Sequence, residues 1–250
     1  MMEAITPVDA VPALDREEAA RLSRVEYERF ADQLRSLAVG DWTKRTECPA
    51  WDVRAMAAHV LGMMEGFSSL REFVHQMSSA KKAAGDGPFI DGLTAVQVRD
   101  RSDLSPPLLL ERIVGMGPRA SRSRRNVPGP LRRITMKQEV GGVEEKWRFG
   151  YLLDVILTRD CWMHRIDIAR ATDREFHATP DHDGRIVADV VAEWGRRHGA
   201  PFTLRLGGPA GGVFTTGTLG EEFEIDAIEF CRTLSGRARG AGLLGQEVPF

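Results

Sequence analysis

Three side chains of the kind that bind metal ions occur on predicted helices whose neighbouring residues are apolar. Asp160 and His164 lie four residues apart on one of these segments, and His59 is surrounded by alanine, valine and methionine on another. An unpaired polar group in a protein core costs roughly 2–7 kcal/mol on transfer scales. We therefore expect these side chains to be compensated, and a divalent cation shared between the two helices would compensate all three.

The spacing of these residues supports a shared site. Positions i and i+4 of an α-helix lie on the same face, so Asp160 and His164 can present their side chains to one point. Asp167 continues that face one turn later. Two histidines and one carboxylate form a ligand set that leaves an open position for water or substrate on a catalytic zinc ion. Asp167 would then orient His164 by accepting the hydrogen of its other ring nitrogen.

Each residue also has an interpretation without a metal. A single buried histidine such as His59 is more often a hydrogen-bonded core residue than a ligand. Asp160 could pair with Arg165 instead. Cys161 is a competing ligand, because it lies three residues before His164 and zinc favours thiolates. The residues alone leave these alternatives open.

Composition argues against several classes of partner. The chain has 250 residues, 42% of them hydrophobic, and a formal net charge of −2. This balanced charge does not favour binding to nucleic acid or to an anionic membrane. We expect neither a signal peptide nor a membrane-spanning segment. The three cysteines are odd in number and too widely spaced for a disulfide framework, which predicts a cytoplasmic protein.

Hydrophobic periodicity predicts a fold that is mostly α with a small α+β part. Principal helices are expected over residues 16–39, 53–79, from 105 onward and over 147–171, with a further helix at 183–198. Alternating residues at 202–206 and an extended run at 213–216 predict strands, and a short helix is expected at 226–234. The predicted domains are a helical bundle carrying the metal site over residues 1–174 and a small α+β domain over 175–250.

Two other features have both a structural and a functional interpretation. The segment from Arg119 to Arg133 is rich in arginine and contains proline and glycine, which predicts a solvated loop. Its functional alternative is a lid that attracts a carboxylated thiol or substrate. Trp51 lies just before the second helix and is expected to contact the start of that helix, with a place in the lining of the thiol site as the alternative.

Three segments carry a family resemblance. The first runs from Trp42 through T-E-C-P-A-W at 46–51 to Val53 and His59, and it resembles the pattern W…T-x-C-P-G-W-x-V…H. The second, D-C-W-M-H-R-I-D at 160–167, resembles E-x-x-x-H-x-x-D, and the third, F-C-R-T-L-S-G-R at 230–237, resembles a C-terminal L-S-G-R ending. These patterns are similar to those of the mycothiol-dependent maleylpyruvate isomerase family, within the DinB-like metal-binding superfamily. The resemblance extends over essentially the whole chain.

The resemblance implies a DinB-like four-helix bundle followed by a sterol-carrier-protein-like α+β domain. It also implies zinc, or another divalent metal, held by His59, Asp160 and His164, with mycothiol as the thiol cofactor. An arginine of the C-terminal domain serves the substrate carboxylates in the isomerases, and Arg237 is the matching position. The chain departs from the pattern at Ala50, which replaces glycine. It departs again at Asp160, which replaces a glutamate longer by one methylene.

The activity implied is that of a mycothiol-dependent isomerase or thiol S-transferase acting on a small electrophilic substrate. In an isomerase, zinc lowers the pKa of the thiol, and the thiolate adds to a cis-enedioic acid. Rotation about the new single bond and elimination then give the trans isomer. Two alternatives remain from the residues themselves: a hydrolase in which zinc activates water, and a non-catalytic ligand-binding protein of the same fold. The sequence leaves the substrate and the oligomeric state open.

Overall fold

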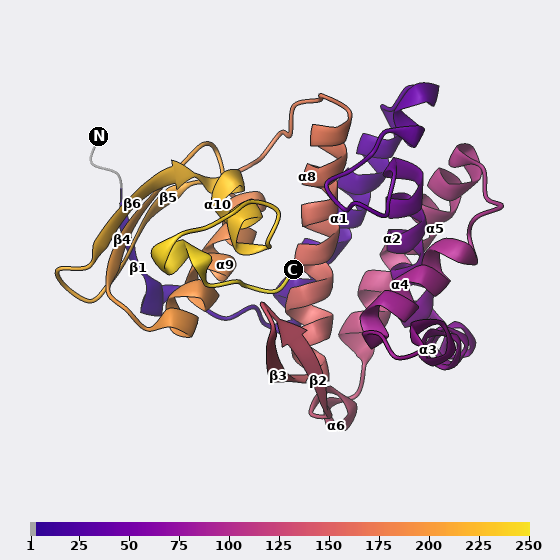
Figure 1. Ribbon diagram of the computed structural model, residues 1–250, viewed down its shortest axis with the longest axis horizontal. Coiled ribbons are helices and arrows are strands. Elements are labelled where there is room, and N and C mark those ends of the chain that lie inside the picture. Colours follow the sequence, from indigo (N-terminus) through magenta and orange to yellow (C-terminus); the bar gives the residue numbers. More distant parts are fainter. Residues whose placement is uncertain (1–3) are drawn as a thin grey trace. The chain divides into compact units, whose positions relative to one another are not determined.

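The computed structural model describes residues 4–250 (Figure 1). The chain forms two compact units that each take several segments of the sequence. We call Arg16–Arg132 with Asp160–Phe176 the helical unit, and residues 4–15 with Arg133–Arg159 and His177–Phe250 the sheet unit. The predicted fold class, mostly α with a small α+β part, is confirmed. The domain boundary at residue 174 stays a prediction.

The helical unit is built from long amphipathic helices. Asp52 caps the second of them, because its Oδ1 accepts a hydrogen bond of 2.8 Å from the backbone N–H of Ala55. The last helix, α8, begins in the sheet unit and runs on through the helical unit. The elements are α1 (Arg16–Arg35), η2 (Val39–Thr43), α2 (Val53–Ser68), α3 (Leu70–Ala84), α4 (Phe89–Arg99), α5 (Pro106–Asn126), α6 (Gly129–Arg132) and α8 (Leu157–Ala171).

The core of the helical unit joins α1, α2, α5 and α8. Its fully buried residues include Phe30, Leu34, Met56, Leu61, Met64, Leu109, Ile113 and Ile168. One buried ion pair ties α1 to α8, since Arg165 Nη1 lies 2.7 Å from Glu26 Oε1. Gln33 donates a further hydrogen bond of 2.9 Å to the carbonyl of Arg165. These contacts fix α8 beside α1 and so hold the residues of its middle turns in place.

The helix predicted over residues 53–79 is wrong in its length, because the chain leaves the helical conformation at Ser69. This residue is extended, with φ −142° and ψ 121°, and its hydroxyl caps α3 by accepting from the N–H of Glu72. Leu70 and Val74, which would continue the apolar spacing of a single helix, are 80% and 56% exposed. Serine hydroxyls favour helix ends over helix interiors, and here they end a periodicity that hydrophobic spacing alone would continue.

The loop predicted from Arg119 to Arg133 is also wrong, since α5 continues as a helix to Asn126. Pro118 lies inside this helix on its exposed side, where the missing N–H is tolerated at the cost of one helical hydrogen bond. Arg124 is 3% exposed and donates a 2.8 Å hydrogen bond to the hydroxyl of Tyr27. The arginines of this segment therefore include buried structural residues, and most of the segment is helical.

The sheet unit contains a four-stranded sheet in the order β1-β5-β4-β6. Strand β5 runs parallel to β1 and antiparallel to β4, while β4 runs parallel to β6. Trp194 of α9 is fully buried, with its ring 4.6 Å from that of Phe202 and 5.3 Å from that of Phe230. The elements are β1 (Ile5–Pro7), η1 (Val8–Ala10), β2 (Thr135–Val140), β3 (Val143–Arg148), α7 (Phe149–Tyr151), the π-helical turn η3 (Leu152–Ile156), α9 (Asp183–His198), β4 (Phe202–Gly207), β5 (Gly212–Thr216), β6 (Glu221–Asp226), α10 (Ala227–Leu234) and η4 (Gly242–Gly245).

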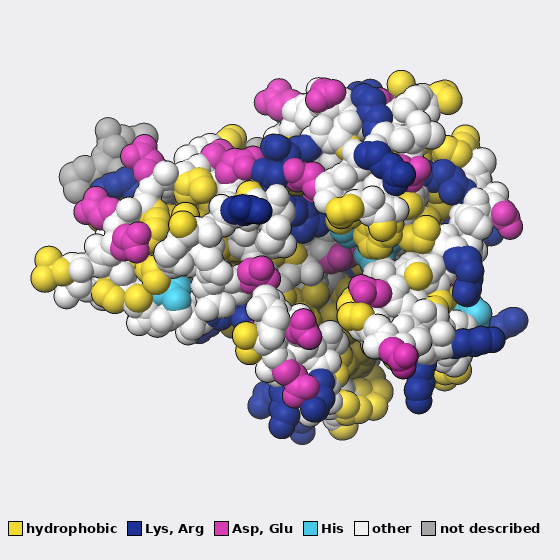
Figure 2. All heavy atoms as spheres, viewed as in Figure 1, with side chains coloured by type: hydrophobic (Ala, Val, Ile, Leu, Met, Phe, Trp, Pro, Cys, Tyr) yellow, Lys and Arg dark blue, Asp and Glu magenta, His cyan; other side chains and the backbone are white. Residues whose placement is uncertain are grey.

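The hairpin of β2 and β3 replaces the start of the helix predicted from Trp147. Gly141 and Gly142 connect the two strands with φ values of 56° and 78°, the left-handed conformations that a tight two-residue hairpin turn requires. Trp147 lies in β3, and α8 begins only at Leu157. Within residues 4–250, no helix combines the length and apolar composition needed to span a bilayer. Figure 2 shows basic and acidic side chains interspersed over the face in view.

Candidate metal site

His59, Asp160 and His164 converge within the helical unit. His59 comes from the second turn of α2, whereas Asp160 and His164 lie one turn apart on α8. Asp160 Oδ2 is 3.5 Å from His59 Nε2, and Asp160 Oδ1 is 3.3 Å from His164 Nε2. One potential ligand atom from each residue lies within 4.8 Å of the others. The structure therefore brings together the three residues that sequence analysis singled out.

The site is largely withdrawn from solvent. The side chains of His59 and His164 are 5% and 6% exposed, and that of Asp160 is 21% exposed. Arg165, which could have paired with Asp160, instead forms its ion pair with Glu26. The carboxylate of Asp160 thus faces the two imidazoles and keeps a partly open side.

The second nitrogen of each imidazole has a partner of its own. His164 Nδ1 lies 3.0 Å from Oδ2 of Asp167, which is fully buried. His59 Nδ1 lies 2.8 Å from Oε1 of Gln97 on α4. Both partners are hydrogen-bond acceptors at these atoms, so each imidazole carries its hydrogen on Nδ1 when it is neutral. The lone pairs of both Nε2 atoms are then directed to the side where Asp160 lies.

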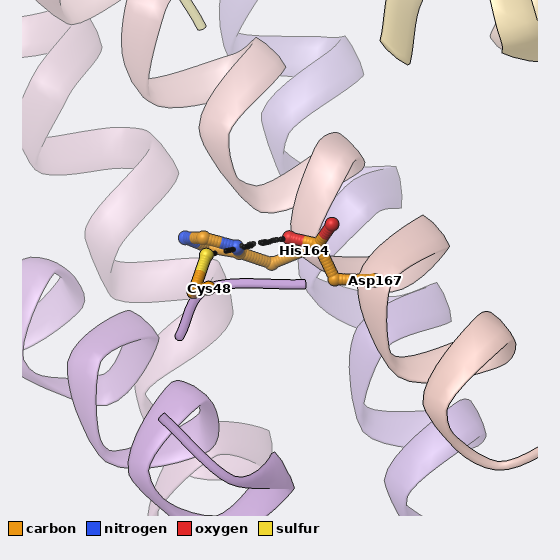
Figure 3. A group of neighbouring side chains, drawn as sticks. All are labelled: Cys48, His164 and Asp167. Carbon is orange, nitrogen blue, oxygen red and sulfur yellow. Dashed lines mark hydrogen bonds and ion pairs between the residues drawn. The ribbon is translucent and has the colours of Figure 1, made fainter. Parts of the chain in front are cut away.

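Cys48 lies behind His164, next to Asp167. Figure 3 shows the three side chains together, with Cys48 reaching them from the loop before α2. Cys48 Sγ is 4.0 Å from Asp167 Oδ2, so its thiol is a weak donor to the carboxylate that orients His164. The potential ligand atoms of Cys48, His164 and Asp167 also lie within 4.8 Å of one another.

Electrostatics at the site reflect three acceptor groups facing each other. Burial opposes the charging of His164, but the nearby carboxylate of Asp160 raises the pKa of His164 to about 9. Burial likewise disfavours the charged form of Asp160, yet His164 and His59 hold the pKa of Asp160 well below its usual range. A positive charge is thus strongly favoured between these groups, and either a proton or a metal cation can supply it.

The donor set fits a divalent metal. Two imidazole nitrogens and one carboxylate oxygen, with the opposite imidazole nitrogens hydrogen-bonded to further residues, match the arrangement that zinc sites use. Cys161 belongs to neither group of potential ligands among residues 4–250. Its side chain is buried in the core of the helical unit, and burial raises the pKa of its thiol well above the ordinary value.

Of two further neighbours of the site, sequence analysis gave Trp51 a lining role only as the alternative interpretation, and it missed Gln97. The ring of Trp51 lies 4.8 Å from that of His59 and 5.8 Å from that of His164, centroid to centroid, so Trp51 lines the site rather than only the start of α2. Gln97 was missed although it is a polar residue in an apolar helix, the same signal that identified His59. The lining by Trp51 depends on the path of the loop before α2, which periodicity does not predict.

Arg237 lies in the sheet unit, directly after α10. Its backbone N–H donates to the carbonyl of Arg232 at 3.0 Å, and it follows Gly236, whose φ is 78°. This left-handed glycine ends the helix, as glycine often does at this position. The role of Arg237 toward substrate stays a prediction.

Comparisons with known proteins place these residues in a wider group. A family model described as the mycothiol maleylpyruvate isomerase N-terminal domain matches residues 23–169, a range that includes all three potential ligands. Two similar solved structures are a crystal structure of the mycothiol-dependent maleylpyruvate isomerase and one of its histidine-to-alanine mutant. Each is 16% identical, has a TM-score of 0.56, and covers 93% of this chain and 92% of that chain. No curated protein matches this chain.

Proposed function

The chain belongs to the mycothiol maleylpyruvate isomerase family, and we propose that it is a metal- and mycothiol-dependent isomerase or thiol S-transferase. Its substrate would be a small electrophile, and the isomerases of the family suggest one that bears carboxylates. The family that the sequence motifs predicted is thus confirmed by the family model, which covers more than half of the chain. The metal, the substrate and the reaction remain parts of the proposal.

The observation that carries the proposal is the convergence of two imidazole Nε2 atoms on the carboxylate of Asp160. His59, Asp160 and His164 would hold the metal through these atoms. Gln97 and Asp167 would keep both imidazoles in the tautomer that leaves Nε2 free. A divalent metal bound here would lower the pKa of a thiol ligand, so that mycothiol is available as a thiolate at neutral pH.

The remaining residues act on the thiol and the substrate. The Trp51 ring covers the two imidazoles and would keep water away from that side of the site. In an isomerase, the thiolate adds to one carbon of a cis double bond, the adduct rotates about the resulting single bond, and loss of the thiolate forms the trans isomer. We assign Arg237 to the substrate carboxylates, where a guanidinium can form paired charge-assisted hydrogen bonds.

Metal analysis and turnover test this proposal together. Protein purified without a metal-affinity tag should contain about one equivalent of divalent metal per site. Incubated with mycothiol and a cis-enedioic acid, it should form the trans isomer, or the stable thiol adduct if it is a transferase. Thiol-independent hydrolysis of esters or amides would contradict the proposal in favour of a hydrolase. Stoichiometric metal without turnover of any substrate would indicate a binding protein.

A pair of histidine variants gives the matched control. His59→Ala removes one proposed ligand and should abolish both metal retention and thiol-dependent turnover. His75→Ala removes an imidazole on α3 that is 47% exposed and pairs with Asp100 at 2.7 Å, so it should change neither. Full activity of His59→Ala would show that the metal mechanism is wrong.

A further inference from the structure

The hydrogen bond behind His59 is the end of a buried chain of two glutamines, Gln76 and Gln97, which we call the amide relay. Gln76 is 2% exposed and Gln97 is 1% exposed. Gln97 Nε2 donates to Gln76 Oε1 at 3.0 Å, and Gln97 Oε1 faces His59 Nδ1 at 2.8 Å. Buried primary amides lose their hydrogen bonds to water, so each must find partners inside the protein.

The direction of the amide relay is set at its far end. The Gln76 amide nitrogen lies 2.8 Å from the carbonyl of Gly62 and 2.9 Å from Glu72 Oε1. The carbonyl oxygen of Gly62 can only accept a hydrogen bond, and the same holds for Glu72 Oε1 when Glu72 is ionised. Burial opposes that ionisation, but hydrogen bonds from Gln76 and Arg101 hold the pKa of Glu72 below its ordinary value. Gln76 must therefore present its NH₂ group to them.

The rest of the chain follows from that orientation. With its nitrogen engaged, Gln76 offers only Oε1 to Gln97, so Gln97 must turn its NH₂ group toward Gln76. The sulfur of Met63, 2.8 Å from the same nitrogen, accepts a further hydrogen. Gln97 then has only its oxygen left for His59. Each step has a single assignment that satisfies every donor, and its result is an Nδ1–H on His59.

Helix α2 has glycines where the side chains of the amide relay pack against it. A Cβ atom at Gly62 would lie 2.6 Å from the Cβ of Gln97, and one at Gly66 would lie 2.9 Å from Oε1 of Gln76. Both glycines are on α2, one and two turns beyond His59. Arg101 closes the far side, donating to the carbonyl of Gln97 at 3.0 Å and to Glu72 at 3.0 Å. The glutamines thus occupy a space that any larger residue on α2 would fill.

We propose that Gln97, oriented by Gln76, is a positioning residue that holds His59 as the Nδ1–H tautomer and so reserves Nε2 for a divalent metal. This inference rests on the proposed function, in which His59 is a ligand. A metal-binding imidazole usually donates its other N–H to a carboxylate, a backbone carbonyl or water. Here His164 has a carboxylate, whereas His59 has a neutral amide fixed by a relay. The two ligands are therefore polarised unequally.

The first test reads the tautomer in the wild-type protein without metal. Long-range ¹H–¹⁵N NMR spectra, assigned with His59→Gln and recorded where the ring is neutral, should show a protonated Nδ1 and an unprotonated Nε2 for His59. A protonated Nε2 would overturn the relay. This measurement does not need a bound metal, so it decides the relay even if the protein is found not to bind one.

The second test measures zinc affinity by competition with a chromophoric chelator. Gln97→Met keeps the size of the side chain but replaces the amide oxygen by a sulfur, a much weaker acceptor for Nδ1–H, and it should weaken zinc binding by roughly 10–100-fold. Gln97→Glu retains an oxygen toward His59 and should bind zinc more tightly than Gln97→Met. Gln246→Met, which removes a glutamine hydrogen bond to the carbonyl of Glu247 in the sheet unit, should bind like wild type.

The outcomes separate the two proposals. Equal zinc affinity in wild type and folded Gln97→Met would overturn the relay while leaving the metal site intact. Wild type that binds no zinc but shows the Nδ1–H tautomer would contradict the proposed function and support the relay. If Gln97→Met does not fold, the tautomer measurement on the wild-type protein still decides.

Discussion

The carboxylate of Asp167 lies 3.0 Å from Nδ1 of His164, while the other nitrogen of the same ring faces Asp160 at 3.3 Å. One imidazole thus joins a fully buried carboxylate to one that is partly open. The buried carboxylate of Asp167 can orient the ring, and the partly open carboxylate of Asp160 can bind the same metal ion as the ring. The two aspartates therefore have different roles, and variants of each should change zinc affinity to different extents.

Asp167→Asn should weaken metal binding without abolishing it. The amide oxygen can still accept from Nδ1, but the negative charge that makes His164 a stronger donor is lost. We expect a decrease in zinc affinity of roughly 10–100-fold, as for other changes to the partner of a metal-binding histidine. Chelator competition measures it, with Asp32→Asn on the exposed side of α1 as the control. Unchanged affinity would show that Asp167 does not act on the ligand.

Asp160→Asn should have a larger effect than Asp167→Asn on zinc affinity, since it removes a proposed ligand charge. In the metal-free protein it should also lower the pKa of His164 toward the ordinary value, because Asp160 is the main group that raises it. An NMR titration of the His164 ring measures this shift. Asp160→Glu restores the residue of the resembled motif and should bind zinc. Equal zinc binding by Asp160→Asn would remove Asp160 from the proposed ligands.

Metal binding should release protons at neutral pH. The pKa of His164 is raised from 6.5 to about 9 in the metal-free protein, so this ring is protonated at pH 7, and a metal must displace that proton. Zinc affinity should therefore rise with pH up to about 9 and then level off. Calorimetry in buffers of different ionisation enthalpy counts the protons. Affinity that falls between pH 7 and 9 would contradict this coupling.

The same shift predicts how the stability of the metal-free protein depends on pH. A histidine whose pKa is higher in the folded state stabilises that state fully below its unfolded pKa, and the contribution is lost as pH rises through the folded value. For His164 this window runs from about 6.5 to about 9. Urea unfolding across this range should show a falling free energy of unfolding that His164→Gln does not share.

Gly62→Ala should destabilise the protein by about 1–3 kcal/mol, the usual cost of overpacking a filled core. The added methyl group would meet the Cβ of Gln97, which is close to the backbone and cannot move aside. Gly115→Ala on α5 is the control: nothing lies within 4 Å of its Cβ position, and it is exposed. That substitution should stabilise by about 0.5–1 kcal/mol. Urea unfolding compares the two, and a neutral Gly62→Ala would show that α2 and α4 are loosely packed.

The residues that converge in the candidate site could be found from sequence because they break a local pattern. His59, Asp160 and His164 are polar residues at apolar positions, and the spacing of the last two requires a common helix face. The helix Asp183–His198 was predicted at its observed ends, where Gly199 with φ 66° stops it. Features encoded by a few neighbouring residues are thus readable without the fold.

The features that were missed depend on contacts between distant residues. Strand β1 pairs with β5, which follows it by more than two hundred residues. Strand β6 is short and charged, and it is held in the sheet by pairing in parallel with β4. The relay likewise joins three helices, so Gln76 and Gln97 look like isolated polar residues in the sequence. Such pairings are set by the packing of whole elements and leave little local signal.

The turn between α2 and α3 decides which residues can reach the back of His59. Along one continuous helix, Gln76 would be displaced from Gly62 by about 21 Å, because each residue advances the axis by about 1.5 Å. The chain instead reverses at Ser69, and the Gln76 amide returns to within 2.8 Å of the Gly62 carbonyl. Inserting or deleting one residue between Ser69 and Gln76 would swing that amide by about 100° around α3. The length of this short stretch of chain is therefore a requirement for the amide relay behind His59.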